Sequence, residues 1–327
     1  MVDGLEQVRA IAGPLVTAEA FMRLTRITFL GVLSPRYGAL PKFPFTHLGR
    51  VDGGDRAQHS LGVASIMLRI ISNLALSARA QRYAVAWGLI HDLATWPMSH
   101  TGEAGFARVM DVDSRRLRKG MIEGASWLPR QLTVISQLKE MQIEPDLLLA
   151  LTENDEAGLD SEFRILQRLI HSPITPDSLE GMARSGAVFG VRVPRPEELV
   201  TTLDRDLFSV VINQKRSSYI LQFWRTKGQI YDQHINHWKC IEFESSWSRS
   251  IEETYSRISL IYSLLLSERE LINSVLSTGV PRFGEVRRYK HPLIYGINPE
   301  LHRKRFLRRN VRIEDLRNLL VKSERQL

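Results

Sequence analysis

Apolar residues recur along most of the chain at the three- and four-residue spacing of an α-helix. One such stripe consists of His59, Val63, Ile66 and Ile70. A second consists of Ala84, Trp87, Gly88 and His91. Each stripe carries one histidine among apolar side chains, so both imidazoles are predicted to face the core. Gly88 has no side chain and would let a neighbouring helix approach closely.

Other segments of the chain follow the same helical pattern. They cover residues 16–32, 131–153, 160–171, 196–212, 215–236 and 246–275. Alternation typical of strands is confined to the short segments 186–193 and 241–243, and residues 154–161 are typical of a surface loop. The predicted fold class is therefore all-α, a mostly helical bundle with at most a few short strands. The simplest division is a helical core over residues 1–240 and a C-terminal helical extension over residues 241–327, packed on the core.

Composition supports a globular protein. The chain has 327 residues, of which 43% are hydrophobic and 24% charged, so it is long enough to bury a sizeable core. No apolar run approaches the roughly 18 residues that a membrane helix needs, and no signal peptide is apparent. The lone cysteine, Cys240, cannot form an internal disulfide. Together these features predict a cytoplasmic protein.

The chain is basic, with a formal net charge of +8 and a pI near 9.7. This balance favours acidic ligands such as nucleotides or nucleic acid. Much of the excess lies in residues 302–312, which contain six arginines and lysines. This segment could bind phosphate or nucleic acid, and the alternative is a solvated face or a contact between subunits.

Four residues from separate segments carry the candidate chemistry: His59, the adjacent pair His91 and Asp92, and Asp177. Asp177 follows Thr175-Pro176, which is typical of a helix start. Two imidazoles and two carboxylates that meet at one point would form a mixed nitrogen and oxygen metal site, able to hold a phosphate ester for hydrolysis. Alternatively, His59 is a hydrogen-bonded core histidine and Asp177 only stabilises a helix N-terminus.

In combination, these segments resemble the HD-domain phosphohydrolase superfamily. The nearest branch is that of the deoxynucleoside triphosphate triphosphohydrolases, which includes the sterile-alpha-motif/HD-domain dNTPase and bacterial dGTPases. The resemblance extends over roughly residues 20–235 and is carried by four segments: Phe21 to Gly31, Arg56-x-x-His59-Ser-Leu-Gly-Val63, His91-Asp92-Leu-Ala-Thr-Trp-Pro-Met-Ser-His100, and Ile174 to Arg184.

The resemblance implies a helical bundle and a set of site residues. The divalent metal ion, which could be Mn, Mg, Fe, Co, Ni or Zn, would be held by His59, His91, Asp92 and Asp177. Arg56 would contact substrate phosphate, and its planar fork of donors suits that role. His100, with Glu103 behind it, would protonate the leaving oxygen. Family members are often oligomers, so a homo-oligomer is expected.

Two further residues are candidates for substrate binding, namely Arg184 and Tyr231. Each candidate has a structural alternative. Arg184 could form an ion pair within the protein, and Tyr231 could belong to the core. Likewise Arg56 could pair with Asp55 or another acid, and His100 could cap or brace a turn.

The sequence departs from the branch at two places. Thr95 stands where the family has its second histidine, and Ser114 to Lys119 occupies the place of a downstream His-Glu pair. The leading expectation is a metal-dependent phosphohydrolase acting on a nucleotide, above all a deoxynucleoside triphosphate. The alternatives are a phosphatase or phosphodiesterase on another phosphorylated metabolite or nucleic acid, and a catalytically weak protein that binds nucleotide or nucleic acid. A di-iron oxygenase would need more histidines than His100 and His171 between the ligand motifs.

Overall fold

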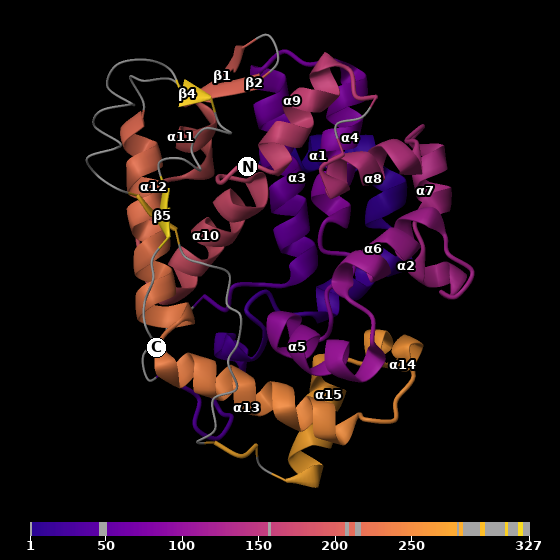
Figure 1. Ribbon diagram of the computed structural model, residues 1–327, viewed down its shortest axis with the longest axis vertical. Coiled ribbons are helices and arrows are strands. Elements are labelled where there is room, and N and C mark those ends of the chain that lie inside the picture. The colour runs from indigo at the N-terminus through magenta and orange to yellow at the C-terminus, as the bar shows by residue number, and fades with distance from the viewer. Residues whose placement is uncertain are drawn as a thin grey trace.

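Helices make up most of the chain in the computed structural model (Figure 1), which confirms the all-α prediction. The structure describes residues 2–45, 51–155, 158–206, 209–212, 217–279, 281–283, 295–297, 311–312 and 320–322. The helices are α1 (Val2–Val16), α2 (Glu19–Met22), α3 (Arg56–Asn73), α4 (Ala78–Ile90), α5 (Ser99–Met110), α6 (Ser114–Glu123), α7 (Ile135–Glu140), α8 (Pro145–Glu153), α9 (Ser161–Ile170), α10 (Pro176–Phe189), α11 (Pro196–Val200), α12 (Ser217–Ile230), α13 (Trp238–Thr254), α14 (Leu260–Leu265) and α15 (Glu268–Thr278).

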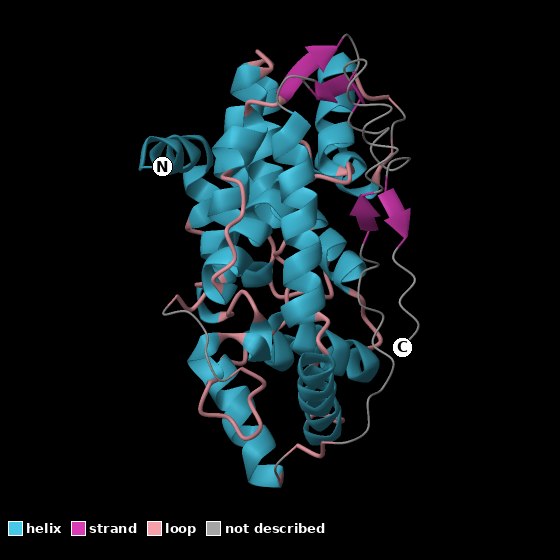
Figure 2. Cartoon of the chain, turned by 90° about the vertical axis from the view of Figure 1, so that its left-hand side faces the viewer, coloured by secondary structure: helices cyan, strands magenta, loops and turns pink. Residues whose placement is uncertain are grey.

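Short turns and strands complete the described chain. The 3₁₀ turns are η1 (Arg23–Arg26), η2 (Gly31–Leu33), η3 (Pro35–Tyr37) and η4 (Arg130–Leu132), and the π-helical turn η6 (Tyr231–Ile235) follows α12. The strands are β1 (Leu203–Asp206), β2 (Ser209–Ile212), β3 (Tyr295–Ile297), β4 (Val311–Arg312) and β5 (Leu320–Lys322). They form two small antiparallel sheets, ordered β1-β2-β4 and β3-β5, at the edge of the helical body (Figure 2).

Helices α3 and α4 pack directly against each other in the core. The predicted stripe residues of α3 are buried, and so are those of α4 up to Ile90. A Cβ atom placed on Gly88 would lie 2.6 Å from the Ala64 Cα, so the two backbones touch where Gly88 has no side chain. This confirms the predicted close approach. It also fixes the end of α4, where His91 follows, against the middle of α3.

Local capping explains where the helices begin. The Asp55 side chain accepts a hydrogen bond from the Gln58 backbone N–H at 2.8 Å and starts α3. Thr175 caps α10 in the same way through the Ser178 N–H at 2.9 Å, with Pro176 in the first turn. This confirms the helix start predicted before Asp177.

The C-terminal helices pack on the rest of the chain. Helix α13 lies along α5, and α15 lies beside α13 (Figure 1). Residue 240, where the predicted core was divided from the extension, is inside α13. The division at residues 240 and 241 itself stays a prediction. Of the basic segment 302–312, residues 302–310 lie outside the described residues.

Several predicted helices are broken by local signals. Residues 16–32 contain the end of α1, then α2, η1 and the start of η2. At Gly31 the φ is +57°, and a Cβ atom there would clash with the Met98 carbonyl oxygen. The segment 131–153 divides before Pro145, whose preceding residue Glu144 is extended, as proline requires. The segment 246–275 divides where Ser259 and Ser267 cap α14 and α15.

The predicted strands are also wrong. Segment 186–193 is helical up to Phe189, and α10 ends at Gly190 with a φ of +68°. Segment 241–243 lies inside α13, where Ile241 and Phe243 are buried. Conversely, the predicted helix 196–212 ends at Val200, and β1 and β2 follow it. Short apolar runs do not distinguish strand from buried helix, since both need apolar residues.

Within the described ranges, every helix is too short or too polar to cross a bilayer. The predicted helices 160–171 and 215–236 correspond to α9 and to α12 with η6, so these two assignments are confirmed.

Candidate metal centre and its cavity

Helices α3, α4 and α10 bring the four predicted ligands together. The Nε2 atoms of His59 and His91 lie 3.3 Å apart, and Asp92 Oδ2 lies 3.8 Å from each of them. Asp177 Oδ1 lies 3.0 Å from His59 Nε2 and 3.8 Å from His91 Nε2. One ligand atom each from His59, His91 and Asp92 fits within 4.8 Å of the others, a cluster of the size that a single cation occupies.

The outer nitrogens of both imidazoles are already engaged. His91 Nδ1 lies 2.8 Å from the Gly88 carbonyl, which can only accept, so this nitrogen carries the hydrogen. His59 Nδ1 contacts the Glu180 carboxylate in the same manner. When both imidazoles are neutral and carry their hydrogen on Nδ1, the Nε2 lone pairs of His59 and His91 face each other. A cation between them satisfies both, which is how metal-binding histidines are commonly oriented. The donor set therefore fits a divalent metal ion.

The electrostatics of the metal-free centre agree with this arrangement. Burial opposes a charge on His59, but hydrogen bonds to Asp177 and Glu180 outweigh it and raise the pKa of His59 to about 9. Burial likewise opposes a charge on Asp177, yet His59 and His91 lower the pKa of Asp177 to about 2. Without an ion, a proton on His59 replaces part of the positive charge that the carboxylates require.

Arg56 occupies the wall beside the centre. Arg56 is 4% exposed, and its guanidinium donates to Asp92 Oδ2 at 2.9 Å and to Ser99 Oγ at 2.9 Å. Burial would raise the pKa of Asp92, but Arg56 together with His91 holds it well below its usual range. The acid that Arg56 pairs with is therefore Asp92, while Asp55 caps α3.

A buried glutamate holds the turn that positions Ser99. Met98 and Ser99 have φ values of +63° and +52°, which are unfavourable for side chains of L-residues. The Glu268 carboxylate accepts from the Met98 N–H at 2.7 Å, the Thr28 N–H at 3.0 Å and the Thr28 hydroxyl at 3.1 Å, and also from the Tyr37 hydroxyl. The C-terminal helix α15 thus supports Arg56 through this turn.

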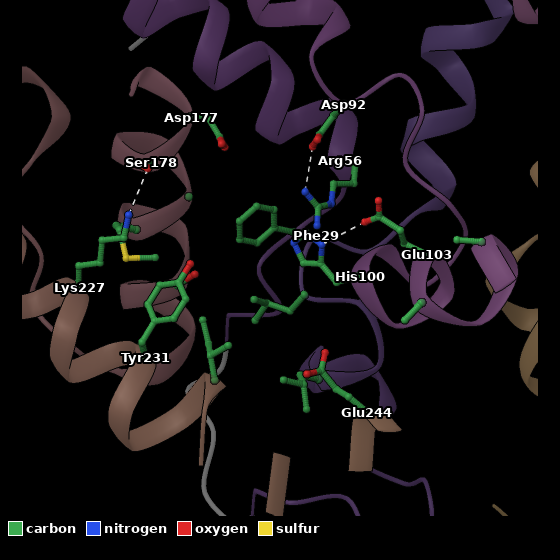
Figure 3. A pocket seen from close by; sticks show the side chains of 18 residues that line it. Phe29, Arg56, Asp92, His100, Glu103, Asp177, Ser178, Lys227, Tyr231 and Glu244 are labelled. Atoms are coloured by element: carbon green, nitrogen blue, oxygen red, sulfur yellow. Dashed lines mark hydrogen bonds and ion pairs between the residues drawn. The ribbon is translucent and has the colours of Figure 1, made fainter. Parts of the chain in front are cut away.

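A cavity of about 460 Å³ opens beside the centre (Figure 3). Its lining comprises Phe29, Leu30, Leu33, Arg56, Asp92, His100, Glu103, Ala104, Ala107, Asp177, Ser178, Gly181, Met182, Ser185, Lys227, Tyr231, Ile235 and Glu244. We call the part formed by Asp92, Asp177 and Arg56 the metal end. Glu244 lies on the opposite side, below His100 in Figure 3, and we call its surroundings the remote end.

His100 and Glu103 lie together on the first turns of α5. His100 Nδ1 is 3.6 Å from Glu103 Oε2, and the His100 side chain is 75% exposed. The interaction with His100 lowers the pKa of Glu103, which also accepts a hydrogen bond from Ser114. The predicted pair is therefore adjacent, and it stands at the open wall of the cavity.

Lys227 and Tyr231 enter the cavity from α12 and η6. Lys227 Nζ donates to Ser178 Oγ at 3.3 Å, next to Asp177, and burial lowers the pKa of its ammonium. Among the described residues, no carboxylate forms an ion pair with Lys227. Burial also raises the pKa of Tyr231 to about 12, so its hydroxyl stays protonated. Tyr231 was a predicted pocket residue, whereas Lys227 was not predicted.

Arg184 lies behind the centre, on the far side of Glu180. Its Nε donates to both Glu180 carboxylate oxygens at 3.1 Å, and its Nη1 donates to the Gly53 carbonyl at 2.8 Å. It is not among the residues that line the cavity. Glu180 was missed by the sequence reasoning. It follows Asp177 by three residues on one helix face, which was the available signal.

A second cavity, of about 300 Å³, borders the other side of the centre and shares Asp92 and Asp177 with the first. Arg118 lines it and donates to the His91 carbonyl at 3.0 Å. Arg118 belongs to the segment Ser114 to Lys119, where the resembled branch has a His-Glu pair. On this side of the centre the chain therefore presents the basic Arg118, where the resemblance implied a histidine and a glutamate.

No model of a known protein family matches the chain. Uncharacterized protein MG461 of Mycoplasma genitalium is 25% identical over 227 residues, which are 66% of this chain and 50% of that protein. Its homologue in Mycoplasma pneumoniae is 30% identical over 180 residues, 54% of this chain and 39% of that protein. The chain thus spans half or less of the length of these curated relatives.

Solved structures show a shared fold. A hypothetical protein from Aquifex aeolicus superposes with a TM-score of 0.60 at 20% identity, over 80% of this chain and 66% of that one. A phosphohydrolase from Bacteroides thetaiotaomicron superposes with a TM-score of 0.58 at 19% identity, over 80% of this chain and 64% of that one. The chain therefore has the fold of a known phosphohydrolase and carries a histidine and aspartate cluster within it.

Proposed function

We propose that the protein is a metal-dependent phosphohydrolase that acts on nucleotides, with deoxynucleoside triphosphates as the leading substrate class. One observation carries the proposal: His59, His91 and Asp92 form a cluster that Asp177 borders, and Asp92 and Asp177 of this group line a cavity of about 460 Å³. The same cavity presents Arg56, Lys227 and His100. The fold shared with a phosphohydrolase supports the reaction class. The finer assignment to deoxynucleoside triphosphates rests on the resemblance of the motifs.

The chain's own cations would bind the phosphate groups. Arg56 is held by Asp92 and Ser99, so its remaining donors have a fixed direction at the metal end. The Lys227 ammonium stands beside Asp177 without a carboxylate partner among the described residues, and an ammonium in that state gains most from an anionic ligand. A divalent ion, when bound, would neutralise phosphoryl oxygens and lower the pKa of a water toward about 7 in favourable cases.

His100 is the proposed general acid. Its ring lies on the cavity wall, and its Nδ1 is 3.6 Å from Glu103 Oε2. A protonated His100 could donate to the oxygen that leaves phosphorus. General acid catalysis of this kind is typically worth about 10²–10⁴-fold in rate.

The test is a nucleotide panel with Mn²⁺, in which products are identified as triphosphate, pyrophosphate or orthophosphate. Metal content is measured on the same samples. The expected result is release of triphosphate from at least one deoxynucleoside triphosphate. Failure to hydrolyse any nucleotide while the ion is bound would overturn the proposal.

Lys227→Met provides a matched test of phosphate binding. Loss of a charge-assisted hydrogen bond should raise KM by roughly 10–100-fold, while metal content stays unchanged. Lys239→Met alters an exposed lysine of α13 and should leave KM as it is. A KM for Lys227→Met equal to that of the control would remove Lys227 from the site.

A second candidate, favoured by a specific observation, is a phosphatase or phosphodiesterase on another phosphorylated metabolite or on nucleic acid. The observation is that Thr95 and Arg118 stand where the resembled branch has histidine or a His-Glu pair. Orthophosphate released from monophosphates, or cleavage of an oligonucleotide, would favour this candidate. Nucleic-acid binding through residues 302–312 and assembly into a homo-oligomer also remain proposals. A truncation after residue 300 tests the first, and light scattering tests the second.

A further inference from the structure

Two buried glutamates of the C-terminal helices differ in how their carboxylates are satisfied. Glu268 is 4% exposed and accepts from four donors on Thr28, Met98 and Tyr37. Glu244 is 5% exposed, and within the described chain the Thr101 hydroxyl, at 3.3 Å, is its one hydrogen-bond donor. A carboxylate can accept about four hydrogen bonds. Glu244 therefore has most of its acceptor capacity unused.

The unused acceptors face the cavity. Glu244 lines it from α13, and its carboxylate points into the open space at the remote end (Figure 3). Ile235, Leu30 and Leu33 are among the apolar lining residues and offer it no donor. Burial raises the pKa of Glu244 to about 8, which reflects how little its surroundings stabilise the charge. Such a group, buried in a core of apolar side chains, is destabilising unless a ligand completes its hydrogen bonds.

We propose that Glu244 determines substrate specificity by accepting hydrogen bonds from N–H groups of the nucleobase at the remote end of the cavity. The inference rests on the proposed function, because it requires the phosphates to lie at the metal end beside Arg56 and Lys227. A nucleotide has its charge at one end and its N–H donors at the other. The cavity has cations at one end and an acceptor at the other, so the two are complementary.

Physical chemistry predicts a large discrimination. A site built around a polar group rejects a ligand that leaves this group unpaired, because the desolvation of the group is then uncompensated. A purine without its exocyclic amino group should therefore be a poorer substrate. The expected ratio for one hydrogen bond to a buried group that is otherwise left unpaired is roughly 10–100-fold in kcat/KM.

The experiment compares dGTP with dITP and dATP with the triphosphate of 2′-deoxynebularine, whose bases differ only in the amino group. The Mn²⁺-loaded wild type, Glu244→Gln and Glu244→Leu are assayed for kcat/KM. The wild type should prefer at least one amino-bearing base by roughly tenfold or more, and Glu244→Leu should reduce that ratio to within about twofold. Glu242→Gln, on the same helix but away from the cavity, should retain the wild-type ratio.

A second readout separates this inference from the proposed function. Binding of the corresponding deoxynucleosides, which have no phosphate, is measured by calorimetry on the same loaded proteins. Base-dependent binding that Glu244→Leu abolishes would support Glu244 even if no nucleotide is hydrolysed. Hydrolysis with equal base ratios in the wild type and both variants would overturn the role of Glu244 and leave the phosphohydrolase intact. If the loaded wild type neither binds a deoxynucleoside nor hydrolyses a nucleotide, both the role of Glu244 and the proposed function are overturned.

Discussion

The two ends of the cavity differ in how completely their polar groups are paired. At the metal end, each imidazole has its outer nitrogen engaged, and Arg56 is held by Asp92 and Ser99. At the remote end, Glu244 has one long hydrogen bond from Thr101. A fully connected network is rigid and holds an ion or a transition state in a fixed geometry. A sparsely paired group instead gains most from the ligand, which makes it a selector of substrates.

The largest effect is expected from breaking the metal end at Asp92. Asp92→Asn removes the negative charge that pairs with Arg56 and borders both imidazoles. Activity should fall by about 10²–10³-fold, the range seen when a preorganised electrostatic group is removed from an active site. Metal content, measured by elemental analysis, should fall with it. Asp146→Asn, at an exposed position of α8, is the control, and equal activity of the two variants would refute the assignment.

A smaller effect is expected at Glu180, which contacts the outer nitrogen of the proposed ligand His59. Glu180→Gln weakens the acceptor that fixes the hydrogen on His59 Nδ1. Partners of this type typically contribute about 10–100-fold to metal affinity, so Mn²⁺ should bind that much more weakly in a chelator competition. Glu140→Gln changes an exposed glutamate of α7 and should bind Mn²⁺ as the wild type does. Equal Mn²⁺ affinity of Glu180→Gln and Glu140→Gln would contradict the role of Glu180 in orienting His59 at the metal end.

The pH dependence of metal binding follows from His59. In the metal-free protein its pKa is raised to about 9, so binding an ion at lower pH displaces one proton. Apparent affinity for Mn²⁺ should therefore decrease by about tenfold for each pH unit below 9. Calorimetry in two buffers of different ionisation enthalpy would detect the released proton. Binding that is independent of pH between 7 and 9 would contradict a charged His59.

The stability of the metal-free protein should change in a related way. Because the pKa of His59 is raised above its ordinary value of 6.5, its contribution to stability is complete below pH 6.5 and is lost as the pH rises through 9. The melting temperature of the metal-free protein should decrease over that interval. The metal-loaded protein should not show this loss, since its His59 is already neutral.

The smallest effect is expected from a change in backbone packing that supports the metal end. In Gly88→Ala the new methyl group would lie 2.6 Å from the Ala64 Cα, so α3 and α4 must separate. Overpacking of this kind destabilises a protein by about 1–3 kcal/mol, and it should also weaken metal binding because His91 follows α4. In Gly228→Ala, on α12, the methyl group meets nothing within 4 Å. This control should be stabilised by roughly 0.5–1 kcal/mol, as measured by chemical denaturation.

Prediction from the sequence succeeded where local chemistry decides. The stripe that contains His59 and Val63, and the Thr175-Pro176 start of α10, depend on spacing and capping within a few residues. It failed for strands 186–193 and 241–243, because short apolar runs look alike in a strand and in a buried helix. It also failed for long helices such as 246–275, where single serine caps divide the segment.

By itself, the sequence determined the helical class, the helix faces that carry His59 and His91, and the helix start at Asp177. Only the tertiary structure decided that Lys227 and Glu244 share one cavity with Asp92 and Asp177, and that Glu268 supports Arg56 from α15. The physical reason is range. Periodicity and capping act between neighbours in the chain, whereas burial and the pairing of charges depend on contacts between segments as far apart as Thr28 and Glu268.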